Sequence, residues 1–141
     1  ASGRCREEDP ESESDFSAEC LNIMETIFSK IIRKEIPADI VYEDETVLAF
    51  RDIHPLAPVH ILIIPKQEIM SIASLEDADA PVVGHMFAVA RDIARDLNIS
   101  EKGYKLLIRV GEHGGQEVPH LHLHLIGGAR LSENIHPVGV Q

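Results

Sequence analysis

Three histidines stand at alternate positions near the carboxyl end of the chain: His120, His122 and His124. Their residue type and their regular spacing make them the leading candidates for a catalytic or binding site. Alternate side chains of an extended strand point to the same face of a sheet, so these three would share one face. The leucines that follow each of them would occupy the opposite face and enter the core. A solvated face that happens to carry histidines is the plainer interpretation, but three in succession argue against it. The pattern therefore predicts a strand that lines a polar site.

One chemistry open to such a row is metal binding, because imidazole nitrogens are common metal ligands. Along a strand, His120 and His124 are separated by roughly 13 Å. Ligand nitrogens on one tetrahedral zinc ion lie only about 3–4 Å apart. A metal site would therefore use two of the three histidines and recruit His60, His113 or a carboxylate.

The second chemistry is phosphoryl transfer. One imidazole of the row would attack phosphorus, while its neighbours hold the ring, neutralise charge on the phosphoryl oxygens and deliver a proton to the leaving group. Histidine suits these tasks because its ordinary pKa of about 6.5 allows either protonation state near neutral pH. Gly114 and Gly115, just upstream, allow the backbone to approach an anion closely. The linear arrangement favours this interpretation over the metal site.

Hydrophobic periodicity and turn signals predict the elements that must position this strand. Thr26 can cap a first helix that Pro37 ends, Ser74–Asp77 is a capping-box pattern ahead of a longer helix, and Gly103 is a stop signal beyond it. The links between strands are too short for helical crossovers, which predicts an α+β domain with an antiparallel sheet of about five strands. The expected helices cover residues 27–34 and about 80–97, and the expected strands cover 40–43, 47–50, 59–64, 104–110 and 118–126.

Length and composition limit the classes of function. The 141 residues fit one domain, and an apolar content of 44% supports a packed core. Acidic residues outnumber basic ones 24 to 13, for a formal net charge of −11, which argues against binding nucleic acid polymers through their phosphates. No apolar run approaches the roughly 18 residues that span a bilayer. We therefore expect a cytoplasmic protein with no membrane partner.

The charge is concentrated at the amino end. Residues 1–23 contain seven acidic residues against two arginines, and few apolar residues, which predicts a disordered acidic extension. The folded domain is expected over residues 24–141. Both cysteines, Cys5 and Cys20, fall in the extension, so we expect neither thiol chemistry nor a cysteine-bound zinc in the domain.

The segment from His120 to Ile126 resembles the signature of the histidine triad (HIT) family, in which three histidines alternate with apolar residues. Further blocks resemble the Hint-type branch of that family, and they follow in the same order along the chain. The resemblance covers roughly residues 24–130. The blocks that carry it are residues 26–37, 48–53, 57–60 and 114–116, together with Gly127 and Gly128.

This resemblance implies a purine nucleoside phosphoramidase that cleaves the P–N bond of adenosine or guanosine 5′-phosphoramidates, releasing the nucleoside monophosphate and an amine. It implies a covalent nucleotidyl-histidine on His122, no metal and no cofactor, and a homodimer whose sheet continues across the interface. Two alternatives stay open. The chain could be a nucleotide-binding regulatory or scaffold protein with little catalysis, or a hydrolase with a histidine-bound metal.

The same resemblance assigns expected roles to individual residues. His124 would lie against the phosphate, and His120 and His60 would support the nucleophile. Asp52 would grip the ribose, since one carboxylate can accept from both hydroxyls. The base pocket would be formed by Phe28, Ile31, Ile36, Phe50 and Ile53, and the phosphate would be approached by Gly115, Gln116 and Glu117.

Two positions depart from the family pattern. Arg109 occupies a site that often carries asparagine near the ribose and phosphate, so a cation there could reach the phosphate or point to solvent. Glu117 stands where animal members carry serine, and since a carboxylate repels phosphate, only its backbone is expected to contribute. The other histidines are expected at surface or loop positions, with His113 notable because it adjoins the glycines: His54, His85, His113 and His136.

Overall fold

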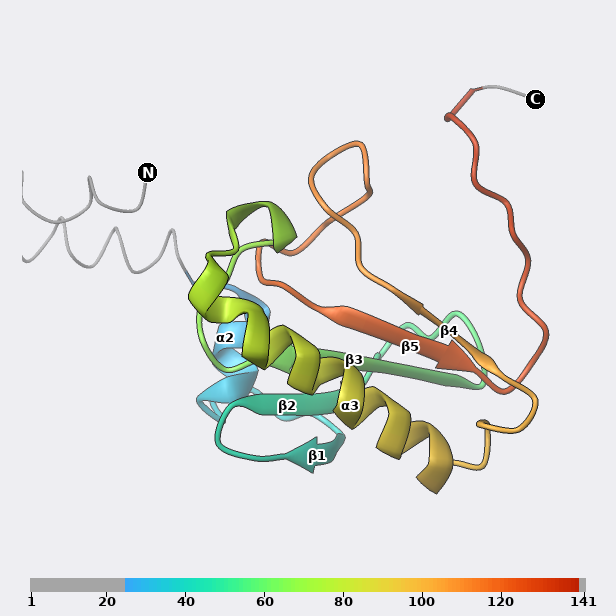
Figure 1. The fold of residues 1–141 in the computed structure, drawn as a ribbon, viewed down its shortest axis with the longest axis horizontal. Coiled ribbons are helices and arrows are strands. Elements are labelled where there is room, and N and C mark those ends of the chain that lie inside the picture. Colours follow the sequence, from blue (N-terminus) through green and yellow to red (C-terminus); the bar gives the residue numbers. More distant parts are fainter. Residues whose placement is uncertain (1–24, 140–141) are drawn as a thin grey trace, which may run out of the picture.

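The computed structural model describes residues 25–139, which form one antiparallel sheet with helices on both faces (Figure 1). The strand order is β1-β2-β3-β5-β4, so the predicted α+β class and five-stranded sheet are confirmed. The predicted extension over residues 1–23 lies outside the described residues. The elements are α2 (Ile27–Ile32), β1 (Ile40–Glu43), β2 (Val47–Arg51), β3 (Val59–Pro65), α3 (Ala80–Asp96), β4 (Tyr104–Leu107) and β5 (Leu123–Gly127).

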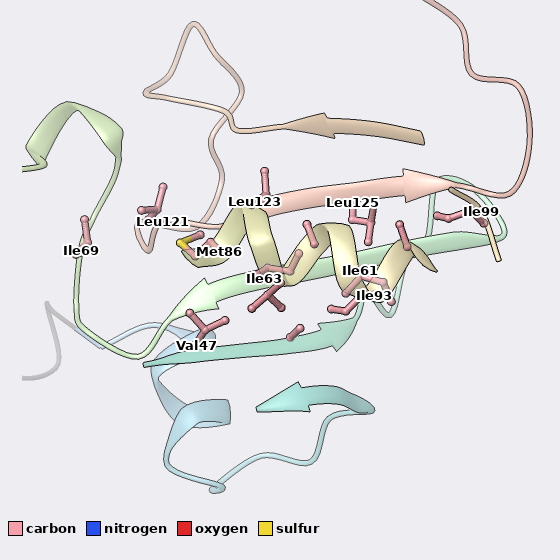
Figure 2. Packing of buried hydrophobic residues seen from close by; sticks show 14 residues of the cluster. Val47, Ile61, Ile63, Ile69, Met86, Ile93, Ile99, Leu121, Leu123 and Leu125 are labelled. Atoms are coloured by element: carbon pink, nitrogen blue, oxygen red, sulfur yellow. The ribbon is translucent and has the colours of Figure 1, made fainter. Parts of the chain in front are cut away.

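The long helix α3 lies across one face of the sheet, and the main core fills the space between them (Figures 1 and 2). Alternate residues of each central strand enter this core, as the period of a strand requires. Each fully buried aliphatic side chain contributes roughly 1.5–3 kcal/mol to stability through removal from water. The core includes Val47, Ile61, Ile63, Met86, Ile93, Leu121, Leu123 and Leu125, all buried.

The opposite face of the sheet is covered in part by the short helix α2. Phe28 and Ile31 of this helix pack with Leu48, Phe50 and Leu62, residues that alternate with the main-core residues along β2 and β3. His60 in β3 and His124 in β5 belong to the same alternation and so lie on this second face. Figure 1 shows α2 on the other side of the sheet from α3.

Local signals explain how α2 begins and ends. Thr26 caps it as predicted: its Oγ1 accepts from the Ser29 amide at 3.1 Å, and Ser29 Oγ accepts in return from the Thr26 amide. The helix is shorter than predicted, because Lys34 adopts a φ of 64°. The Lys34 and Glu35 amides bond back to carbonyls of the last turn, which is the usual way in which a left-handed residue closes a helix.

The last strand begins later than predicted, at Leu123 rather than at residue 118. Pro119 has no amide hydrogen to donate to a neighbouring strand. The His120 amide instead bonds to Val118 O, and the Leu121 amide to Ile69 O, outside the sheet. The side chains still alternate, because Leu121 enters the main core while the flanking histidines do not. The prediction that all three histidines belong to one strand is therefore wrong, although their shared side is correct.

Two further boundaries differ from expectation. β4 ends at Leu107, which pairs with His124, and the chain then leaves the sheet instead of continuing to residue 110. The capping box predicted at Ser74 is wrong: Ser74 Oγ contacts Ser71, and α3 follows a 3₁₀ turn over Asp77–Asp79. The hairpin and the other boundaries of the strands and of α3 agree with prediction to within about two residues. In the described part of the chain, no helix is long and apolar enough to cross a membrane.

Candidate active site

A pocket of about 700 Å³ opens on the face of the sheet that carries α2. Its floor comes from β2 and β3, one wall comes from α2 and the segment that follows it, and the opposite wall comes from the loop between β4 and β5. The residues that line it are Ile27, Phe28, Ile31, Ile36, Pro37, Ala38, Phe50, Arg51, Asp52, Ile53, His54, Leu56, His60, Leu62, Arg109, Gly115, Glu117, Val118, His122 and His124.

All five residues predicted to surround a base line this pocket, and all of them except Ile53 belong to or pack against one apolar cluster. Phe28 and Phe50 meet edge to face with ring centroids 5.6 Å apart. Ile53 is 79% exposed, so it stands at the rim, where a bound ligand would cover it. The remaining two members of the set, Ile31 and Ile36, complete the wall that descends from α2. Such a surface suits a flat, apolar group.

The histidines form a continuous row of rings along the same pocket. The His122 ring lies 5.0 Å from Phe28 and 5.0 Å from His124, and His124 lies 5.2 Å from His60 (centroid distances). Each of the three imidazoles is less than 10% exposed. Two segments distant in sequence, β3 and β5, are adjacent strands in the sheet, and their pairing brings His60 beside His124. The row therefore contains one histidine that does not belong to the triad.

The proton on His122 is placed by the backbone. Its Nδ1 lies 2.6 Å from the carbonyl oxygen of His120, which can only accept, so Nδ1 carries the hydrogen and donates it. A neutral imidazole holds one proton, and Nε2 of His122 therefore keeps a free electron pair. This is the state in which a histidine can attack an electrophile.

The proton on His60 is placed by a second backbone group. The Leu56 amide donates to His60 Nδ1 at 3.0 Å, so the hydrogen of a neutral His60 resides on Nε2. That nitrogen lies 3.0 Å from His124 Nδ1 and 3.5 Å from Asp52 Oδ2. Both neighbours can accept, so His60 donates toward His124 and the carboxylate favours the same arrangement.

Burial sets the charge state of the row. Removal from water lowers the pKa of His60, His122 and His124, because the charged imidazolium loses hydration. For His124, the His122 ring and the Arg109 guanidinium add to this effect and bring the pKa to about 3. The rings are consequently neutral near pH 7, which leaves the lone pair of His122 available.

A cation from the loop after β4 reaches the middle of the row, at His124. Arg109 Nη1 lies 3.1 Å from His124 Nε2, and the Arg109 stem passes over Gly115. A Cβ atom at Gly115 would stand 3.3 Å from Arg109 Cδ, and Gly115 has a φ of 83°. Gly114 is tighter still, because a Cβ there would lie 2.3 Å from the Val110 carbonyl oxygen. The two glycines thus allow the loop to close against its own backbone and hold the guanidinium at the site.

Two predicted site residues do not line the pocket. The His120 side chain is 1% exposed and donates from Nε2 to the Pro65 carbonyl at 2.9 Å. Its contribution to His122 comes from its backbone carbonyl instead. The Gln116 side chain braces the loop: Oε1 accepts from the Gly111 amide, and Nε2 donates to the Met70 and Val118 carbonyls. The Gln116 side chain therefore has a structural role in this loop, and its contact with a phosphate stays a prediction.

Several lining residues were not foreseen. Leu62 pairs with His124 in the sheet register and shares the face of His60, which strict alternation along β3 could have indicated. The Leu56 amide carries no signal in the sequence, because any residue supplies one. Three of the other four histidines are exposed loop residues, as expected, while His85 lies on α3 and bonds to Asp44. Glu117 is exposed at the rim of the pocket.

The donor geometry bears on the metal interpretation. Among residues 25–139, no group of three or more His, Cys, Asp or Glu side chains is arranged to hold a metal ion. His60 and His124 face each other nitrogen to nitrogen at 3.0 Å, and His122 directs its Nδ1 to a carbonyl. These nitrogens are engaged with one another and with the backbone, an arrangement that differs from ligands converging on one point.

An apolar pocket that adjoins a row of buried, neutral histidines is therefore the main feature of this face of the sheet. The chain belongs to the HIT domain family, whose model matches residues 33–131. It is 53% identical over 107 residues to the purine nucleoside phosphoramidase of Escherichia coli (strain K12), across 76% of this chain and 90% of that protein. It is also 51% identical over 108 residues to an uncharacterized HIT-like protein of Synechococcus elongatus, across 77% and 94%.

Solved structures agree with this placement. A HIT family hydrolase from Legionella pneumophila Philadelphia 1 superposes with a TM-score of 0.76 at 45% identity, over 77% of this chain and 97% of that chain. A HIT family hydrolase from Clostridium thermocellum gives a TM-score of 0.75 at 44% identity, over 79% and 96%. The predicted family is therefore confirmed.

Proposed function

We propose that this protein is a purine nucleoside phosphoramidase, a hydrolase that cleaves the P–N bond of adenosine or guanosine 5′-phosphoramidates. The observation that carries the proposal is the state of His122: neutral, with Nδ1 engaged by a carbonyl and Nε2 free, at the junction of the apolar pocket and the histidine row. The 53% identity to a purine nucleoside phosphoramidase supports the same activity.

The presence of apolar residues and of histidines in one pocket supports one orientation of the substrate. The purine base lies between α2 and β2, against Phe28 and Phe50, with Ile53 covering its edge. The ribose hydroxyls donate to Asp52, whose carboxylate lines the pocket with its Oδ2 3.5 Å from His60 Nε2. The phosphoryl group then lies beside His122 and His124, within reach of the loop that carries Gly115 and Glu117.

The reaction runs in two transfers at phosphorus. Nε2 of His122 forms a bond to phosphorus as the P–N bond breaks, and the leaving amine takes up a proton from solvent. Water then attacks the nucleotidyl-histidine, its oxygen becomes the new phosphate oxygen, its protons return to solvent, and Nε2 is restored. One water is consumed overall, and the products are the nucleoside monophosphate and the protonated amine. The imidazoles of His124 and His60 stay neutral, and they orient hydrogen-bond donors toward the phosphoryl oxygens.

Two further features belong to the proposal. The protein acts as a homodimer whose sheet continues between subunits. β1 and β4 are the edges of the sheet within residues 25–139, and an edge strand presents unpaired backbone groups that a second copy can bond. Light scattering tests the dimer directly. The cytoplasmic location stays a prediction of the sequence.

Turnover of a panel of adenosine and guanosine phosphoramidates with different amines tests the activity. His122→Gly should abolish release of the amine while AMP binding persists, and His85→Gln on α3 should match the unaltered protein. AMP binding without turnover of any member of the panel would favour the regulatory alternative. Turnover that survives His122→Gly, or that a chelator removes, would contradict the covalent mechanism.

A further inference from the structure

The contact between Arg109 and His124 brings two hydrogen-bond donors together. The Leu56 amide fixes the hydrogen of neutral His60 on Nε2, and this hydrogen is donated to His124 Nδ1. His124 must then carry its own hydrogen on Nε2, since a neutral imidazole has one. That N–H faces Arg109 Nη1 at 3.1 Å, and a guanidinium has no acceptor.

The reverse arrangement of protons is not available. If His124 Nε2 accepted from Arg109, its Nδ1–H would require a lone pair on His60 Nε2. His60 would then have lone pairs on both nitrogens while the Leu56 amide donates to one of them, which describes an anionic imidazolate. The Asp52 carboxylate, 3.5 Å from His60 Nε2, opposes that state further. The chain of contacts therefore ends in two donors that share no acceptor from residues 25–139.

The position of the guanidinium is built into the loop. Gly115 leaves room for the Arg109 stem, and no ion pair within residues 25–139 includes Arg109. Its positive charge reaches the whole row, because it lowers the pKa of His60, His122 and His124. A cation held beside a donor without an acceptor is suited to an anionic oxygen that accepts from both.

We infer that Arg109 and the Nε2–H of His124 together form a two-donor site for a phosphate oxygen, and that Arg109 makes this site selective for a dianionic phosphate. The inference rests on the proposed function, which supplies the nucleotide. A phosphoramidate monoester carries one negative charge on phosphorus, whereas a monophosphate carries two above its second pKa of about 6. Arg109 therefore favours the nucleoside monophosphate, which is the product, over a ligand of the same shape and lower charge.

The test measures affinity at pH 7.5 for three ligands that share the adenosine moiety: AMP, the uncharged isostere 5′-O-sulfamoyladenosine, and adenosine. Arg109→Gln should weaken AMP binding roughly tenfold to a hundredfold, because a charge-assisted hydrogen bond is lost. It should leave the affinities for the other two ligands unchanged. Arg109→Lys should recover part of the AMP affinity, because it restores the charge without the planar fork. Arg95→Gln, on the solvent side of α3, controls for the change in net charge.

Nitrogen-15 NMR of the histidine rings provides a readout that does not depend on activity. His124 in the free protein should show the Nε2–H tautomer, and the Nδ1–H tautomer would overturn the inference. Equal losses of affinity for all three ligands in Arg109→Gln, or undiminished AMP binding by that variant, would also overturn the inference. Neither result would contradict the proposed phosphoramidase activity, which the turnover assay measures separately. Failure of the unaltered protein to bind AMP would overturn both the inference and the proposed function.

Discussion

His122 Nδ1 and the backbone carbonyl oxygen of His120 lie 2.6 Å apart, so the proposed nucleophile is oriented by main chain and not by a neighbouring side chain. The His120 side chain turns the other way, to the Pro65 carbonyl, and packs edge to face against Phe28 with ring centroids 6.0 Å apart. The two histidines thus have different tasks although they belong to one motif. His122 is the proposed nucleophile, and the His120 side chain fixes the path of the chain that presents it.

Replacing each of these histidines by glutamine should separate the two tasks. His120→Gln keeps the carbonyl that accepts from His122, so phosphoramidase turnover should be reduced but measurable. Its cost should appear in stability, about 1–3 kcal/mol, because a buried hydrogen bond and ring packing are lost. His122→Gln should show the reverse, with no turnover and little change in stability. Single-turnover rates and denaturant unfolding measure both quantities; equal rates for the two variants would contradict the assignment.

The pH dependence of turnover should reflect the burial of His122. Burial is the largest influence on its pKa and lowers it from the ordinary value of 6.5, so the ring stays neutral as the pH falls below that value. The acid limb of kcat/KM, which reports the free enzyme, should therefore have its midpoint below pH 6.5.

Two variants shift that midpoint in opposite directions. The Asp52 carboxylate raises the pKa of His122 and the Arg109 guanidinium lowers it. Asp52→Asn should move the acid limb to lower pH, and Arg109→Gln should move it to higher pH. If the midpoint of the acid limb lay at or above pH 6.5 in the unaltered protein and neither variant shifted it, a group other than His122 would control the pH dependence.

The alternation of histidines with leucines correctly predicted the side of the chain on which each histidine lies. This holds even for His120 and His122, which precede the observed strand. The reason is that Leu121 is held in the core by the loop after β3, so the extended path persists without sheet pairing. The Thr26 cap and the hairpin signals were equally informative, because they depend on a few adjacent residues, whereas the capping box predicted at Ser74 was wrong. The base-pocket residues could be assigned only by resemblance, since Phe28 or Phe50 considered alone would be ordinary core.

The rest of the site depends on contacts that local patterns do not contain. The Leu56 amide that fixes the proton on His60 is a backbone group present at every residue except proline. The position of Gln116 follows from three backbone partners in separate segments. The approach of Arg109 to His124 requires the register of β4 against β5 and the tight turn at Gly114. Each is set by tertiary structure.

Gly114 should tolerate no side chain. A Cβ atom there would lie 2.3 Å from the Val110 carbonyl oxygen, so Gly114→Ala must displace the loop that carries Arg109. AMP affinity and turnover should both fall at least about tenfold, as expected when a loop moves by an ångström or more. Gly84→Ala is the matched control. Nothing lies within 4 Å of its added Cβ, and in the interior of α3 alanine should raise stability by about 0.5–1 kcal/mol. Unchanged AMP binding in Gly114→Ala would contradict this account of the loop.

Asp44 should stabilise the hairpin of β1 and β2 in a pH-dependent manner. It accepts from the Thr46 and Val47 amides, from the Tyr42 hydroxyl and from His85 Nε2. Burial alone would raise the pKa of Asp44, but these hydrogen bonds outweigh it and hold the pKa well below its usual range. The stabilisation is therefore complete above the unfolded value of about 4 and is lost as the pH falls below it.

Asp44→Asn should lower the free energy of unfolding at pH 7 by about 1–2 kcal/mol. It should also flatten the decline in stability below pH 4. Asp96→Asn, an exposed change on α3, should do neither. Thermal or urea unfolding at pH 7, 4 and 3 supplies the comparison, and parallel pH profiles for the two variants would rule out the role of Asp44.

Asp52 should be the determinant of ribose recognition. Its Oδ1 accepts from the His54 amide at 2.8 Å, which fixes the carboxylate at the pocket wall, while Oδ2 lies near His60. A carboxylate held there can accept from both ribose hydroxyls, and an amide can accept on one oxygen only. The unaltered protein should therefore bind AMP at least about tenfold more tightly than 2′,3′-dideoxyadenosine 5′-monophosphate. In Asp52→Asn the affinity for AMP should fall toward that of the dideoxy ligand, whose own affinity should change little. Calorimetric titration of both ligands against both proteins forms a closed cycle, and if Asp52→Asn weakened the two ligands equally, the carboxylate would be acting through His60 instead of through the ribose.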